Sequence, residues 1–130
     1  MKRTNQVSKI IFTLLFFALT TFCFSVPISY ADAPKDVTIK YDSATQTLSV
    51  TITHKSSFPG MHHIKSVEIK KNGAVVSTTN YETQPKDVPY AYTYKVEAKN
   101  GDKLEATATC NLSGSKTASI TVTAAANAGK

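Results

Sequence analysis

Residues 103–114 read KLEATATCNLSG. Apolar or small side chains occupy every second position, at Leu104, Ala106, Ala108 and Cys110, and polar side chains lie between them. This period of two is typical of a β-strand with one buried face. The Asn-Leu-Ser-Gly run after the strand predicts a turn. We therefore expect Cys110 at the end of a strand, with its sulfur on the buried face.

The same alternation recurs along the chain and predicts an all-β fold. It is clearest in residues 47–53, where Leu48, Val50 and Ile52 alternate with serine and threonine. Asn72-Gly73 is a strong hairpin signal. Short strands separated by turns, with no helical pattern after the N-terminal leader, predict a seven-stranded antiparallel sandwich of immunoglobulin type. The expected strands are 37–41, 47–53, 64–70, 74–79, 90–97, 103–110 and a last one carrying Ala118, Ile120 and Val122.

Residues 1–31 have the pattern of a secretory signal peptide. A basic start precedes an apolar run over 10–24, and Ser29 and Ala31 place small residues at −3 and −1 of a cleavage site. We expect cleavage after Ala31, which leaves one domain, 32–130, in a periplasmic or secreted protein that meets the membrane only through its signal peptide. The alternative is an uncleaved anchor, although the apolar run is shorter than the ~20 residues that a membrane span needs.

The charge pattern argues against a nucleic-acid partner. The full chain has fifteen Lys and Arg against nine Asp and Glu, a net charge of +6. Three of the basic residues lie in the leader, which leaves twelve lysines, nine acidic residues and a net charge of +3 for the mature domain. The lysines form no cluster interleaved with aromatic residues, as a nucleic-acid surface requires. A protein partner or a homo-oligomer is compatible with this composition.

Cys110 is the one cysteine expected in the mature domain, because Cys23 lies in the leader. Exported domains usually pair their cysteines, so an unpaired one is a buried hydrophobe, a metal ligand or a reactive thiol. The three histidines, His54, His62 and His63, lie at the strand ends on either side of one loop. Imidazoles with one thiolate suit iron, copper or zinc. The alternative is that the adjacent histidines are simply exposed to solvent.

Three segments, in order, resemble the superoxide reductases of the desulfoferrodoxin and neelaredoxin family. Residues 61–69 (MHHIKSVEI) resemble the family's E-H-H/Y-I-x-x-I-E-L segment, and residues 101–114 resemble its G-K-L-x-A and C-N-x-H-G motifs. Lys35-Asp36-Val37 is similar to the family's K-H-V. The resemblance covers nearly the whole mature chain and implies a seven-stranded sandwich. It also implies a mononuclear iron with four imidazoles and one axial thiolate, which reduces superoxide to hydrogen peroxide.

The resemblance assigns roles residue by residue. Cys110 matches the thiolate ligand, His62 matches one ligand histidine with His63 beside it, and Lys35 matches a lysine that attracts the anion. His54 is out of register with the family, but it has inward parity at the end of its strand and is expected to replace a missing histidine. The expected metal ligands are therefore Cys110, His62, His54 and His63, and Lys35 is the expected catalytic residue.

Three family ligand positions carry other residues here, namely Asp36, Phe58 and Ser113. The smaller set of ligands that remains fits iron or, in its place, copper or zinc. We expect an exported iron-binding protein that reduces superoxide with electrons from an external donor. One alternative is a non-catalytic sandwich that binds or carries a partner and holds no metal, and another is a periplasmic copper- or zinc-handling protein.

Overall fold

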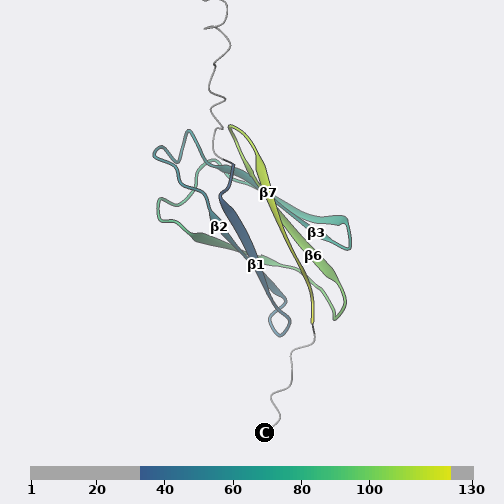
Figure 1. Ribbon diagram of the computed structural model, residues 1–130. Coiled ribbons are helices and arrows are strands. Elements are labelled where there is room, and N and C mark those ends of the chain that lie inside the picture. The colour runs from purple at the N-terminus through teal and green to yellow at the C-terminus, as the bar shows by residue number, and fades with distance from the viewer. Residues whose placement is uncertain (1–32, 124–130) are drawn as a thin grey trace, which may run out of the picture.

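The computed structural model describes residues 33–123, so the predicted signal peptide (1–31) lies outside the described residues. Within 33–123 the chain forms seven β-strands and no helix (Figure 1). No helix in this range is long and apolar enough to cross a membrane. The strands are β1 (Asp36–Asp42), β2 (Thr47–Thr53), β3 (Ile64–Lys71), β4 (Ala74–Asn80), β5 (Tyr90–Lys95), β6 (Lys103–Cys110) and β7 (Ser115–Thr121).

The strands form two antiparallel sheets that pack into a sandwich (Figure 1). One sheet has the order β1-β2-β5 and the other β4-β3-β6-β7. The sheets meet where β1 approaches β7. There the Lys116 ammonium donates to the backbone carbonyl of Lys35 at 2.6 Å and pairs with the Asp36 carboxylate at 3.5 Å. The predicted all-β, seven-stranded, immunoglobulin-like sandwich is confirmed.

The core consists of the inward-facing residues that the alternation predicted. Leu48, Val50 and Ile52 of β2 have no exposed surface, and neither do the alternate residues 104, 106 and 108 of β6. Burying this apolar surface stabilises the fold by about 25 cal/mol per Å². His54 and Cys110 continue the inward register of these two strands and are only 1% and 2% exposed. The two strands thus carry an imidazole and a thiol into the core.

The predicted hairpin at Asn72-Gly73 is also confirmed. Both residues have positive φ, 52° and 84°, as a tight hairpin of this kind requires. The Asn72 amide donates to the Asp102 carboxylate at 2.9 Å, and the Lys103 backbone N–H donates back to the Asn72 side chain at 2.9 Å. Hydrogen bonds, first from the Lys99 backbone N–H and then from Asn72, lower the pKa of Asp102 below its ordinary 3.8.

Tyrosines of β5 pack against the loop 81–89, which joins β4 of one sheet to β5 of the other. The rings of Tyr81 and Tyr92 are stacked with centroids 4.3 Å apart, and Tyr90 meets Tyr92 edge-on at 5.5 Å. The hydroxyls of Tyr81 and Tyr94 lie 2.7 Å apart and share a hydrogen bond. These contacts hold the start of the loop 81–89 on β5.

β5 ends at Lys95, two residues before the predicted end at Glu97. Lys95 pairs with Thr47, which is the first residue of β2. Beyond this pair the Val96 N–H donates to the carbonyl of Gln46, in the turn that precedes β2, at 3.0 Å. The strand stops because its neighbour stops, which alternation within one segment does not reveal.

Candidate metal centre

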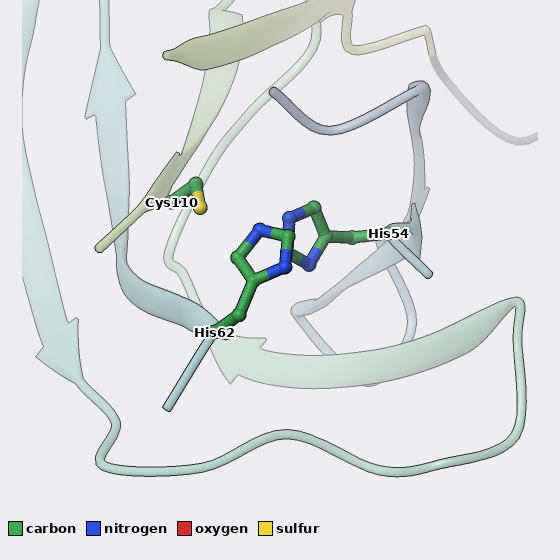
Figure 2. A group of neighbouring side chains, drawn as sticks. All are labelled: His54, His62 and Cys110. Atoms are coloured by element: carbon green, nitrogen blue, oxygen red, sulfur yellow. The ribbon is translucent and has the colours of Figure 1, made fainter. Parts of the chain in front are cut away.

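Three side chains that can ligate a metal meet at one end of the sandwich (Figure 2). They are His54, directly after β2, His62, in the loop before β3, and Cys110, the last residue of β6. One ligand atom from each lies within 4.8 Å of the other two. Bonds of ~2.0–2.3 Å to a tetrahedral metal separate ligand atoms by about 3.3–3.8 Å. Side-chain rotations that move these atoms by about an ångström therefore close the group around one ion.

The strand register explains why residues so distant in the chain converge. Ile64, at the start of β3, pairs with Cys110, so His62 arrives beside the end of β6. His54 comes from the other sheet, as the continuation of β2. The rings of His54 and His62 have centroids 4.6 Å apart and are nearly perpendicular, at 79°. The donor group thus spans both sheets of the sandwich.

Asn111 holds the segment around His62 against the end of β6. Its side-chain carbonyl accepts the N–H of His63 at 2.9 Å, and its amide donates to the carbonyl of Met61 at 2.8 Å. Its backbone N–H donates to the His63 carbonyl at 3.0 Å. The residues on both sides of His62 are therefore fixed by the neighbour of Cys110, and we call this arrangement the Asn111 clamp.

The turn after Cys110 places a backbone N–H against its sulfur. The Leu112 N–H donates to the sulfur at 3.4 Å, and the Cys110 N–H donates to the Gly114 carbonyl at 2.9 Å. The sulfur also lies 3.8 Å from the side-chain carbonyl of Asn111. Gly114 has φ +77°, and a Cβ there would lie 2.5 Å from the Cβ of Ala33. Glycine is thus required where the turn meets the chain entering β1.

His54 is oriented by a residue from the loop 81–89. Its Nδ1 lies 2.6 Å from Oε1 of Gln84, and the Tyr90 hydroxyl donates to the same oxygen at 3.1 Å. Burial, with smaller contributions from Tyr92 and Cys110, raises the pKa of the Tyr90 phenol far above its ordinary 10.0. Tyr90 therefore stays protonated and remains a donor.

Two buried imidazole nitrogens lack a hydrogen-bond partner among the described residues, Nε2 of His62 and Nδ1 of His63. A buried polar atom without a partner costs free energy, and most such atoms in folded proteins have one. A metal ion in the donor group would satisfy the ring of His62. The residues present thus fit a metal by their chemistry as well as by their distances.

The structure does not bring every expected site residue into the donor group. The ring of His63 is buried, 8% exposed, but is not part of the group. Lys35 is exposed, with its N–H bonded to the Thr53 carbonyl and its carbonyl bonded to Lys116. Asp36, at a family ligand position, is exposed and paired with Lys116. The side chains that meet are His54, His62 and Cys110.

A groove of about 370 Å³ opens beside His62. It is lined by Lys55, Ser56, Ser57, Phe58 and His62. One lysine and two serines thus line the groove beside the donor group, and Lys35 is not among its lining residues. Three donors leave coordination positions open on a metal, so an external ligand can bind as well.

Sequence reasoning missed three residues of this site: Lys55, Gln84 and Asn111. Asn111 belongs to the C-N-x segment that carries the family resemblance, so its place beside Cys110 was a usable signal. Lys55 is one lysine among many, and Gln84 lies in a polar loop. Gln84 bonds to residues from other segments, and Lys55 only lines the groove, so nothing local marks either residue.

The fold is that of the superoxide reductases. The superoxide reductase of Giardia intestinalis aligns over 70% of this chain and 100% of its own, with a TM-score of 0.51 and 14% identity. A neelaredoxin-type superoxide reductase of Ignicoccus hospitalis is 20% identical over 70% of this chain and 81% of its own, with a TM-score of 0.49. The neelaredoxin-type superoxide reductase of Archaeoglobus fulgidus is 16% identical over 75% of this chain and 97% of its own, with a TM-score of 0.49.

No protein-family model matches the chain, and no curated protein matches it. At such low identity the likeness to solved structures concerns the fold alone. A chain with the superoxide reductase fold thus carries a partial donor group, two histidines and one cysteine, that can hold a metal ion.

Proposed function

We propose that the protein is an exported iron protein of superoxide reductase type, whose metal is held by His54, His62 and Cys110. The observation that carries the proposal is the meeting of these donors, from three separate segments and both sheets, within 4.8 Å of one another. The orphaned Nε2 of His62 and the N–H directed at the Cys110 sulfur support it. Export rests on the leader pattern of residues 1–31.

His54, His62 and Cys110 would hold a ferrous ion, whose chemistry would be the one-electron reduction of superoxide to hydrogen peroxide, with uptake of two protons and replacement of the electron by an external donor. As a thiolate ligand, Cys110 would donate electron density to such a metal, as thiolates do at other iron sites. The two imidazoles complete the donor group, and the groove beside His62, which Lys55 helps to line, would give the anion an approach.

Metal analysis and an optical spectrum of the protein purified from the exported fraction test the proposal. We expect about one iron per chain, because residues 33–123 contain one such donor group. On oxidation a visible thiolate-to-iron band should appear, and it should be lost in Cys110→Ala. His62→Gln should lose the iron as well, whereas His63→Gln decides whether that buried ring joins the ligands. Reduction of superoxide by the iron-loaded protein would then be measured directly.

A protein that is colourless and metal-free, and stays so after anaerobic addition of iron, copper or zinc, would overturn the metal proposal. It would favour a sandwich that binds or carries a partner. Retention of copper or zinc in place of iron would favour metal handling instead. The donor set itself keeps this second candidate open, because two imidazoles and one thiolate also suit copper and zinc.

A further inference from the structure

Gln84 is buried, 5% exposed, although it lies in the polar loop between β4 and β5. Its amide group makes four hydrogen bonds. Nε2 donates to the backbone carbonyl of His54 at 2.7 Å. Oε1 contacts Nδ1 of His54 at 2.6 Å, the N–H of Ile64 at 3.0 Å and the hydroxyl of Tyr90 at 3.1 Å. One side chain thus connects the end of β2 with the starts of β3 and β5.

These partners fix the orientation of the amide group. A backbone carbonyl only accepts hydrogen bonds, so the group facing the His54 carbonyl is the NH₂ of Gln84. A backbone N–H only donates, so the group facing Ile64 is the oxygen of Gln84. A flipped amide would place donor against donor at Ile64 and acceptor against acceptor at His54, and is therefore excluded.

The orientation of Gln84 in turn decides the tautomer of His54. Nδ1 of His54 faces the same oxygen, which has no hydrogen to give, so Nδ1 must carry the proton. In the neutral ring the lone pair then belongs to Nε2. We propose that Gln84 is a positioning residue, which locks His54 as the Nδ1–H tautomer and thereby presents Nε2 as the metal-binding nitrogen.

This inference deepens the proposed function and rests on it only for what Nε2 binds. Histidines that ligate metals commonly donate their other N–H to a carboxylate, a carbonyl or a water, which fixes ring and tautomer. Here the acceptor is a neutral amide. The imidazole is therefore oriented without the extra negative charge that a carboxylate partner would place beside the metal.

A merely structural role for Gln84 makes a different prediction. Loss of four hydrogen bonds would destabilise the protein in either case, so stability cannot separate the two roles. The tautomer of His54 can separate them, because a residue that only stabilises the fold would not determine which nitrogen of His54 carries the proton. Long-range ¹H–¹⁵N correlation spectra distinguish protonated from unprotonated imidazole nitrogens in the metal-free protein, at about pH 8, above the ordinary histidine pKa of about 6.5.

In wild-type protein we expect His54 as the Nδ1–H tautomer. Gln84→Met has a similar shape but no acceptor and should release the Nε2–H form, whereas Gln84→Glu keeps an acceptor and should retain Nδ1–H. Tyr90→Phe, the matched control, leaves the Gln84 oxygen in place and should not change the tautomer of His54. An Nε2–H tautomer in wild type overturns the inference, even if no variant folds, and so does Nδ1–H that persists in Gln84→Met.

A titration with Co²⁺ extends the test to the metal. Loss of an outer hydrogen-bond partner commonly weakens metal binding by about 10–100-fold. We expect that loss in Gln84→Met and substantial recovery in Gln84→Glu. Equal affinity in wild type and Gln84→Met would refute the positioning role. Wild-type protein that binds no metal would refute the proposed function, while the tautomer measurement still decides whether Gln84 locks His54.

Discussion

Replacing Asn111 by alanine should both destabilise the fold and loosen the donor group. The substitution removes the hydrogen bonds to the His63 N–H, at 2.9 Å, and to the Met61 carbonyl, at 2.8 Å. Each bond contributes about 0.5–1.5 kcal/mol net, so the variant should lose about 1–3 kcal/mol. For a domain of this size each kcal/mol corresponds to about 4–8 °C in Tm, and we expect a Tm lower by about 10 °C.

The Asn111 clamp flanks His62, so part of this free energy also positions a metal ligand. If about 1.4 kcal/mol of it serves that purpose, metal affinity falls about tenfold. Asn111→Asp keeps the acceptor for His63 and loses the donor to Met61, so it should lie between wild type and alanine. Asn80→Ala, on the exposed face of β4, is the matched control for asparagine removal.

Urea unfolding of the metal-free variants, followed by far-ultraviolet circular dichroism, measures the stability. A Co²⁺ titration of the same variants measures the affinity. The reasoning fails if Asn111→Ala loses less than about 0.5 kcal/mol, or no more than Asn80→Ala. If Asn111→Ala lost the expected stability but bound Co²⁺ as tightly as wild type, the link between the Asn111 clamp and His62 would be refuted.

Three further predictions concern the groove, the turn and the hairpin. Lys55→Gln should weaken azide binding to the iron-loaded protein by about two- to fivefold, and by less at high salt, while Lys35→Gln should have little effect. If Lys35→Gln weakened azide binding more than Lys55→Gln, the role that the resemblance gave to Lys35 would be restored. Gly114→Ala should cost more unfolding free energy than Gly101→Ala, because both have positive φ and only the first also meets a close neighbour; equal costs would contradict the contact. Asp102→Asn should destabilise the protein at neutral pH, and its difference in stability from wild type should shrink as the pH falls below 3.8. The reason is that a pKa lowered in the folded state adds stability above the unfolded-state pKa, and this stability is lost in acid. A difference in urea unfolding that does not depend on pH would contradict the prediction.

The sandwich was predictable because its signal is local. Alternation of small and apolar residues fixes which face of a strand is buried, and Asn72-Gly73 fixes one reversal of the chain. The same alternation correctly assigned inward positions to His54 and Cys110, so the possibility of a shared site was visible in the sequence. The end of β5 was not predictable in this way, because it depends on where β2 begins.

Within the site, the sequence could predict that His54, His62 and Cys110 come together, because each lies at or near the end of a strand. The position of the His63 ring was not predictable, since adjacent residues near a strand start point in different directions. The roles of Gln84 and Asn111 depend on bonds to backbone groups from other segments. Such bonds follow from tertiary geometry and leave no periodic trace in the sequence.

The tyrosines on and beside β5 give the molecule a built-in optical reporter. The chain has six tyrosines and no tryptophan, and Tyr81, Tyr90, Tyr92 and Tyr94 lie together in one set of ring and hydroxyl contacts. Tyrosine therefore dominates its intrinsic emission, and four of the six tyrosines lie on or beside β5, at one edge of the three-stranded sheet. Because the Tyr90 hydroxyl and the His54 ring share one oxygen of Gln84, a quenching ion bound at His54 would dim the emission without any added label.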